Sequence, residues 1–169
     1  MSIYLDNAAT SFPKPEEVYR ATDEAMRTMG GNPGRGGHSL TLGAGRLVLA
    51  AREAVAELLR IPDAARLAFM ANATEAINTG LFGILRPGDR VVTTTMEHNA
   101  VTRPLRAMQD RGVEVVKVPA DRTGLVDPAD ICAACMQRDT RMVVMSHCSN
   151  VTGTLQPIEE IGPWCRREG

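Results

Sequence analysis

The sequence has no excess of charge of either sign and no long hydrophobic run. Nineteen basic residues stand against twenty acidic ones, so the formal net charge is −1. Proteins that bind a nucleic-acid backbone or an anionic membrane usually carry a basic patch, so neither partner is expected. No stretch approaches the roughly 18 consecutive apolar residues of a membrane span. The first residues, MSIYLDNAAT, lack the basic and apolar regions of a signal peptide. We therefore expect a cytoplasmic protein.

Lysine is scarce. Only Lys14 and Lys117 accompany 17 arginines. This scarcity leaves few candidates for a reaction that needs a side-chain amine.

Cysteines are few, and without a secretory signal they are expected to be reduced thiols. They are Cys132, Cys135, Cys148 and Cys165. The CAAC spacing of the first two allows a redox or zinc interpretation, but zinc needs about four ligands and no second CxxC or HxxxH exists. The alternative is that both thiols lie half-buried on one face of a helix.

The order of predicted elements indicates an α/β fold. Apolar spacing and turn residues predict a short extended start over 3–5 and then alternating helices and strands. The helices are expected over 15–30, 39–59, 74–85, 101–110, 128–137 and from 157, and the strands over 66–71, 90–96, 113–119 and 141–147. Such alternation predicts a mostly parallel sheet with flanking helices.

The last predicted helix reaches Gly169, where the preceding alternation of helices and strands predicts another buried strand. A parallel sheet of four strands would leave an edge strand without a partner, which natural folds avoid. We therefore interpret the chain as part of a longer protein.

Polar residues follow the predicted strands, where open α/β sheets bind ligands. Thr74 follows the first of these strands, His98 the second and Asn150 the fourth. Thr74 either caps its helix or binds a phosphate at the helix N-terminus. His98 either stacks on a planar ring and moves a proton, or is a polar group satisfied in a loop. Asn150 either binds a phenolic oxygen or forms an Asx turn.

Five segments, taken together, resemble one enzyme family. They are YLDNAATSFP (4–13), NPGRGGH (32–38), ANATEAIN (71–78), MEHNAV (96–101) and SHCSNVTGTLQPI (146–158). Their order and approximate spacing resemble those of the cysteine desulfurases, within the class V aminotransferase group of fold type I pyridoxal-phosphate enzymes. The resemblance covers the whole chain, whereas family members are well over twice as long. It implies the N-terminal part of such an enzyme.

The resemblance implies roles for the residues at the strand ends. Ala73 and Thr74 would bind the phosphate of the cofactor, pyridoxal phosphate. His98 would stack on the pyridine ring and relay a proton, which makes it the candidate catalytic residue. Asn150 would contact the substrate and the phenolic oxygen of the cofactor. No metal ligand is implied.

The resemblance also implies a substrate-side segment and a division into domains. Asn7, Ala8 and Ala9 would lie close to the substrate. Residues 1–30 would form the N-terminal arm and a helix of a small domain. Residues 31–169 would form the N-terminal part of the large cofactor-binding domain, which is incomplete here.

The reaction implied by the resemblance takes sulfur from cysteine or a related amino acid. A cysteine thiolate of the enzyme attacks the substrate sulfur, leaving a protein persulfide and alanine. The implied partners are the amino-acid substrate, a sulfur acceptor protein such as those of iron–sulfur cluster assembly, and a second copy in a homodimer. The alternatives are a selenocysteine lyase, another class V aminotransferase-type enzyme, or a non-catalytic cofactor-binding or scaffold module.

Parts of the family's machinery have no counterpart among these residues. The Schiff-base lysine of the family follows a Ser/Gly-His pair, and neither Lys14 nor Lys117 has that context. The aspartate that pairs with the pyridine nitrogen, the persulfide-forming cysteine and the arginine for the substrate carboxylate are expected after Gly169. Cys148 takes a position that the family usually fills with an apolar residue. The sequence therefore predicts that the chain alone is inactive.

Overall fold

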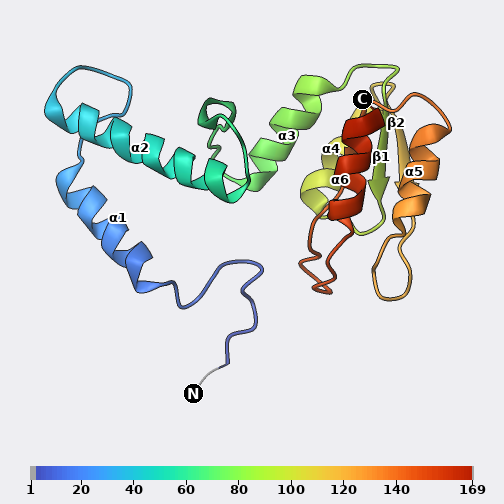
Figure 1. Cartoon of the computed structure of the whole chain (residues 1–169), viewed down its shortest axis with the longest axis horizontal. Helices are drawn as coiled ribbons and strands as arrows, with labels where there is room; N and C mark the ends of the chain where they lie inside the picture. The colour runs from blue at the N-terminus through green and yellow to red at the C-terminus, as the bar shows by residue number, and fades with distance from the viewer. Residues whose placement is uncertain (1–2, 169) are drawn as a thin grey trace. The chain divides into compact units, whose positions relative to one another are not determined.

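The computed structural model describes residues 3–168. The chain forms two compact units, one reaching to Phe69 and one starting at Met70. Figure 1 shows the elements of both units along the chain. Each unit is described here by itself.

The first unit is helical. It contains α1 (Glu16–Thr28), α2 (Ser39–Leu58) and a 3-10 turn, η1 (Ala64–Arg66). α1 begins directly after Pro15, with two glutamates in its first turn and an arginine in its last, an arrangement that suits the helix dipole. Both long helices confirm the predictions, which rest on Pro15 and the first-turn glutamates for α1 and on apolar spacing for α2.

A glycine-rich loop joins α1 to α2, and the backbone leaves no room for a side chain at Gly31. The side chain of His38 caps α2 by accepting a hydrogen bond from the backbone N–H of Thr41. A Cβ atom at Gly31 would clash with the backbone of Leu40 and Thr41, so only glycine fits there. The loop therefore turns the chain sharply into α2.

The strand predicted over 66–71 is wrong. Its first residue ends η1, and the following residues have no strand partner. The carboxylate of Asp63 accepts a hydrogen bond from the N–H of Ala65 at 2.9 Å, which stabilises the turn that replaces the start of the strand. The start of the chain over 3–5 is likewise irregular.

The second unit holds a parallel sheet, as predicted, with three strands among the described residues rather than four. The strands are β1 (Arg90–Thr94), β2 (Glu114–Val118) and β3 (Met142–Val144), in the order β2-β1-β3. The helices between and around them are α3 (Ala73–Ile84), α4 (Asn99–Gln109), α5 (Pro128–Met136) and α6 (Ile158–Glu168). The fold class read from the sequence is therefore confirmed.

Helices cover both faces of this sheet. β1 is buried along its whole length, as expected of a central parallel strand. Val91 packs in a cluster with residues of α3 and α4, and its neighbour Val92 packs in a second cluster with residues of α5 and α6. Because successive side chains of a strand point to opposite faces, one strand organises both halves of the core.

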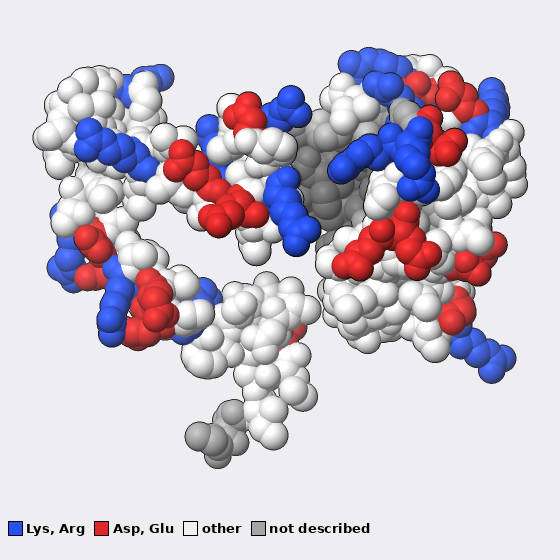
Figure 2. Space-filling model, in the orientation of Figure 1, with Lys and Arg blue, Asp and Glu red and all other residues white. Residues whose placement is uncertain are grey.

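Charge is mixed over the surface. Figure 2 shows basic and acidic side chains interspersed on the face that it draws, over both units. Among the described residues, no helix combines the length and the apolar character needed to cross a membrane.

Candidate functional site

The N-terminus of α3 is capped by Asn72 and not by Thr74. The Asn72 side-chain oxygen accepts a hydrogen bond from the Glu75 N–H at 2.9 Å, and the Glu75 carboxylate accepts one from the Ala71 N–H at 2.8 Å. This reciprocal arrangement resembles a capping box. The alternative that Thr74 serves as the helix cap is therefore wrong.

Capping by Asn72 leaves donors of the first turn unused. Within the described residues, the backbone N–H groups of Ala73 and Thr74 donate to no protein acceptor, and the Thr74 hydroxyl has no protein partner. Both residues are exposed. Two free N–H groups and a hydroxyl at the positive end of a helix form a set of donors that suits an anionic oxygen.

His98 caps α4 with one of its ring nitrogens. Its Nδ1 accepts a hydrogen bond from the Ala100 N–H at 3.0 Å. In the neutral ring, Nδ1 as acceptor requires the proton to be on Nε2. The residue is exposed, and among the described residues Nε2 has no protein partner. The ring is thus held by one nitrogen while the other remains available as a donor.

A groove of about 410 Å³ between α3 and α4 brings Thr74 and His98 together. Its other polar lining residues are Asn78, Asn99 and Arg103. Of the predicted site residues in the second unit, Ala73 and Asn150 are not among those lining it. The groove therefore unites the candidate phosphate ligand and the candidate ring contact, but not the whole predicted set.

Asn150 lies in the loop that follows β3. The turn at this point is made by Ser149, whose hydroxyl oxygen accepts hydrogen bonds from the N–H groups of Val151 and Thr152 at 3.3 and 3.2 Å. The alternative that Asn150 itself forms an Asx turn is therefore wrong. The Asn150 side chain is exposed and makes no hydrogen bond with the described residues.

The loop with Asn150 is anchored at its far end by Gln156, which is 4% exposed. The Gln156 side chain donates to the carbonyl of Gly124 at 2.7 Å and accepts from the Val126 N–H at 3.1 Å. The loop is therefore tied to the segment that precedes α5.

Asn7, Ala8 and Ala9 form an exposed turn in the first unit. The Asn7 side chain accepts a hydrogen bond from the Phe12 N–H at 3.2 Å, which closes this turn locally. Thr74, His98 and Asn150 belong to the second unit.

Neither lysine lies in a strand-to-helix turn. Lys14 is in the first unit, where its Nζ donates to the Ser11 carbonyl at 3.0 Å. Lys117 is an exposed residue inside β2, paired in register with Thr93.

The CxxC thiols lie on α5, with Cys135 buried and Cys132 half-buried. Burial raises the pKa of both thiols, and the nearby Cys165 raises it further. Among residues 3–168, no group of three or more histidine, cysteine or acidic side chains is placed to hold a metal ion. The arrangement agrees with helix-face thiols.

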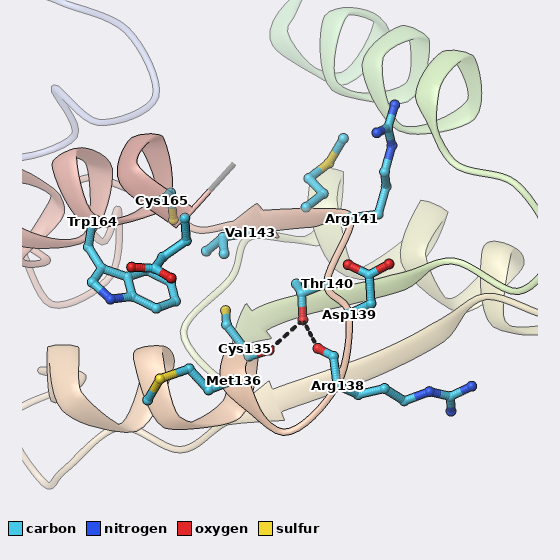
Figure 3. A pocket seen from close by; sticks show the side chains of 11 residues that line it. Cys135, Met136, Arg138, Asp139, Thr140, Arg141, Val143, Trp164 and Cys165 are labelled. Atoms are coloured by element: carbon cyan, nitrogen blue, oxygen red, sulfur yellow. Dashed lines mark hydrogen bonds between the residues drawn. The ribbon is translucent and has the colours of Figure 1, made fainter.

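Cys135 and Cys165 share a cavity of about 380 Å³, shown in Figure 3. Its lining includes Thr140, Arg141 and Met142, which precede or begin β3. The cavity therefore lies near the amino end of that strand, whereas ligands of open α/β sheets bind beyond the carboxyl ends.

The sequence-based reasoning missed Asn78, Arg103 and Glu97. Asn78 and Arg103 line the groove with Thr74 and His98. Asn78 stands four residues after Thr74, a helical spacing that could have indicated it. Glu97 directly precedes His98 and accepts hydrogen bonds from two segments.

Comparison with known proteins agrees with this geometry. A probable cysteine desulfurase of Methanothermobacter thermautotrophicus is 40% identical over 161 residues, covering 95% of this chain and 40% of that protein. The cysteine desulfurase IscS of Glaesserella parasuis is 37% identical over 172 residues, covering 98% of this chain and 42% of that protein. The chain thus spans about two fifths of the length of these curated relatives.

Solved structures give the same result. The apo structure of a cysteine desulfurase from Thermococcus onnurineus NA1 superposes with a TM-score of 0.86 at 30% identity, covering 99% of this chain and 42% of that one. An Escherichia coli cysteine desulfurase, CsdA, superposes with a TM-score of 0.72 at 30% identity over 97% of this chain. These neighbours are fold type I enzymes, as the sequence predicted.

The resemblance to cysteine desulfurases is confirmed by these matches. The sequence pattern of the class-V aminotransferases matches residues 3–169, which is nearly the whole chain. The chain therefore belongs to the class-V aminotransferase family.

Proposed function

We propose that this chain supplies the phosphate and ring contacts of a pyridoxal-phosphate site in a cysteine desulfurase-type enzyme. The observation that carries the proposal is the groove in which Thr74 and His98 meet. The desulfurase relatives and structural neighbours support the assignment to this type of enzyme.

The residues of the α3 N-terminus fit a phosphate group. Because Asn72 performs the capping, the N–H groups of Ala73 and Thr74 and the Thr74 hydroxyl are free to donate. The helix dipole favours an anion at the same place. Arg103 lines the same groove and adds positive charge.

His98 suits a planar ring. Its Nδ1 is fixed by the Ala100 N–H, so the imidazole is oriented before any ligand arrives. A stacked aromatic contact of this kind stabilises by about 0.5–1.5 kcal/mol. The free Nε2–H can donate a hydrogen bond at the reacting centre, where His98 is proposed to relay a proton.

Asn150 and the turn at Asn7, Ala8 and Ala9 complete the proposed set. The Asn150 amide is unoccupied locally and would donate to the phenolic oxygen of the cofactor. The 7–9 turn is proposed to lie on the substrate side. When bound, pyridoxal phosphate would supply an electron sink for electrons released at the substrate Cα.

We further propose that this chain binds the cofactor reversibly and does not release sulfide alone. Neither Lys14, bonded to Ser11, nor Lys117, inside β2, lies in a strand-to-helix turn. The substrate would be cysteine or a related amino acid, the partners a sulfur acceptor and a second copy, and the location the cytoplasm. The proposed domain boundary stays between residues 30 and 31.

The test separates the phosphate contacts from the ring contacts. Equilibrium dialysis measures binding of pyridoxal phosphate, pyridoxal and inorganic phosphate to the wild type and to Thr74→Val and His98→Asn. Hydrogen bonds to charged groups are worth about 1.5–3 kcal/mol, so Thr74→Val should weaken pyridoxal phosphate binding about tenfold or more and leave pyridoxal unchanged. His98→Asn keeps a good helix cap and should weaken both ring-containing ligands by about two- to tenfold.

Thr79→Val is the matched control, because Thr79 is an exposed threonine of the same helix and does not line the groove. It should bind all three ligands as the wild type does. Equal losses for Thr74→Val and Thr79→Val, or no binding by the wild type, would overturn the proposal. A cofactor absorbance band that survives dialysis and maps to Lys14 or Lys117 after borohydride reduction would contradict reversible binding.

A further inference from the structure

Glu97 is the residue before His98, and its carboxylate joins two turns of the second unit. Oε1 accepts hydrogen bonds from the Thr94 hydroxyl at 2.8 Å and from the Ser146 N–H at 2.9 Å. Oε2 accepts one from the Ser146 hydroxyl at 2.9 Å. Three donors from two strand ends thus converge on one side chain.

The two partners sit at the carboxyl ends of neighbouring strands. Thr94 is the last residue of β1 and is 1% exposed, while Ser146 follows β3 by two residues. Thr94 also accepts a hydrogen bond from the Met96 N–H at 3.1 Å, which holds the start of the turn. Glu97 therefore fixes the path of the chain as it leaves β1 and ties that path to the end of β3.

Each tied segment carries a candidate ligand. The turn after β1 leads directly to His98, whose ring is oriented by the Ala100 N–H. The segment after β3 leads from Ser146 to Asn150, and its far end is held by Gln156. Hydrogen bonds to a carboxylate are shorter and stronger than those between neutral groups, so this connection resists local opening.

We infer that Glu97 is a positioning residue that holds the His98 turn and the Asn150 loop in a fixed relation. The inference deepens the proposed function and rests on it for the identity of the ligand. Glu97 acts through its neighbours and need not touch the cofactor. Its function is geometric, so the length of the side chain matters more than its charge.

Two conservative variants separate geometry from charge. Glu97→Gln keeps the length, since its amide oxygen accepts from Thr94 and from the Ser146 N–H while its amide nitrogen donates to the Ser146 hydroxyl. Glu97→Asp keeps the charge but shortens the reach by one methylene. If Glu97 acts by positioning the His98 turn and the Asn150 loop, Glu97→Gln should resemble the wild type more closely than Glu97→Asp does. If charge alone matters, the order is reversed, and the inference is wrong.

Amide hydrogen exchange measured by NMR is the first readout and does not depend on any ligand. Loss of a hydrogen bond to a charged group predicts exchange at Ser146 faster by about tenfold or more in Glu97→Asp. The Ala100 amide, which is bonded to His98, should also exchange faster, although Glu97 does not touch it. In Glu97→Gln, where neutral hydrogen bonds replace those to the carboxylate, both rates should rise less than in Glu97→Asp. An unchanged Ala100 rate in Glu97→Asp would overturn the inference.

Ser146→Ala is the milder companion variant, because it removes one of the three hydrogen bonds and leaves the backbone contact. It should loosen the same amides to a smaller degree and decides the matter if Glu97→Asp does not fold. Glu114→Ala is the matched control. It removes a carboxylate that also bridges two segments, at the amino end of β2, and should not change the Ala100 rate under strongly native conditions.

Pyridoxal phosphate binding is the second readout. Glu97→Asp should raise the dissociation constant about fivefold or more, and Glu97→Gln should raise it less. If the wild type binds no pyridoxal phosphate, the proposed function fails, while the exchange data still decide whether Glu97 couples the two turns. Faster exchange without weaker binding would refute the positioning of the ligand contacts.

Discussion

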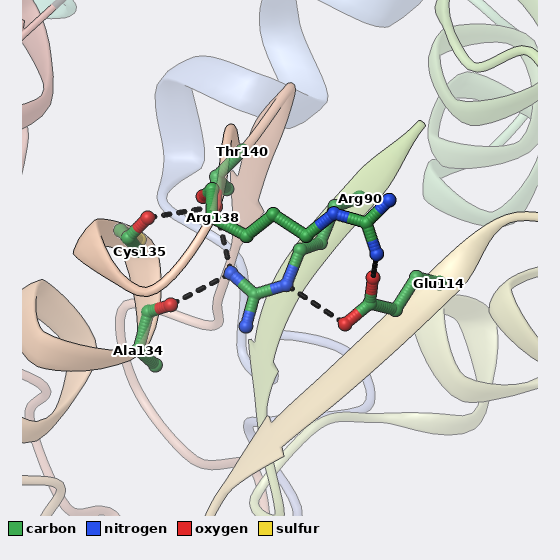
Figure 4. Close-up of polar contacts among 6 residues, drawn as sticks. All are labelled: Arg90, Glu114, Ala134, Cys135, Arg138 and Thr140. Atoms are coloured by element: carbon green, nitrogen blue, oxygen red, sulfur yellow. Dashed lines mark hydrogen bonds and ion pairs between the residues drawn. The ribbon is translucent and has the colours of Figure 1, made fainter. Parts of the chain in front are cut away.

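Replacing Arg90 with alanine should cost the second unit about 3 kcal/mol of its free energy of unfolding. Arg90 begins β1 and its side chain is 4% exposed. Figure 4 shows its guanidinium between α5, the loop before β3 and the start of β2. It donates to the Glu114 carboxylate at 3.0 Å, the Ala134 carbonyl at 2.7 Å and the Thr140 hydroxyl at 2.9 Å.

The magnitude follows from these three contacts. The two neutral acceptors contribute about 1 kcal/mol each, and the charged one about 1.5–3 kcal/mol before screening. The side chain of Glu114 is 44% exposed and keeps Arg138 as a partner, so water and Arg138 offset part of the loss. The Ala134 carbonyl lies in the last turn of α5, which has no basic residue of its own, and it would lose its donor.

Arg138→Ala is the matched comparison, since Arg138 binds the same carboxylate at 3.0 Å but its side chain is 72% exposed. It should cost about 0.5 kcal/mol or less. Urea unfolding is followed by the fluorescence of Trp164, the only tryptophan, which lies in α6 of the same unit. The midpoint should fall by about 1–3 M for Arg90→Ala with the slope unchanged. A cost below about 1 kcal/mol, or equal costs for the two variants, would refute the reasoning.

Three further predictions concern other parts of the second unit. Burial raises the pKa of the Cys135 thiol, so iodoacetamide at pH 8 should modify the exposed Cys148 well before Cys135. Peptide mass spectrometry would measure the two rates of modification, and equal rates would contradict the prediction. Hydrogen bonds, the strongest from the Thr123 hydroxyl, lower the pKa of the Asp121 carboxyl below its ordinary 3.8. The stabilisation of that turn is therefore complete above this value and is lost as the pH falls through the lower folded pKa; an NMR titration midpoint at or above 3.8 would disagree. Gly124→Ala should destabilise by about 1 kcal/mol or more, because the backbone φ of +81° is one that residues with a side chain rarely adopt. An unchanged thermal midpoint would speak against it.

The elements that the sequence predicted correctly are those whose pattern is local. α2, α4 and α5 follow from apolar spacing and from residues that cap or begin helices, such as Asp127 before Pro128. β1 and β2 follow from short apolar runs between turns. The segment 66–71 has a similar apolar run but no strand partner, and pairing is not encoded in the segment itself.

The residue types of the candidate site could be predicted from the sequence. Which residue caps the helix or makes the turn, and which keeps its polar atoms free, could not. The segment ANATEAIN offers both Asn72 and Thr74 as helix caps, and only the backbone decides between them. Asn72 has φ −164° and ψ 169°, the extended conformation of a cap, whereas Thr74 already lies in the helix. In the same way, Ser149 rather than its neighbour Asn150 makes the turn after β3.

At the start of α3 and in the loop after β3, one residue holds the backbone and a nearby residue stays free. This arrangement lets a loop keep its structure while it offers a ligand site. The atom of a polar side chain that hydrogen-bonds to its own backbone is less available to a ligand. Here the turn is made by Asn72 or Ser149, and a residue one or two positions later, Thr74 or Asn150, keeps its polar atoms free. His98 achieves the same result within one ring, because Nδ1 caps the helix and Nε2 stays available. The loops are thus held by hydrogen bonds that leave the candidate ligands unoccupied, so binding would not require the loops to give up their own structure.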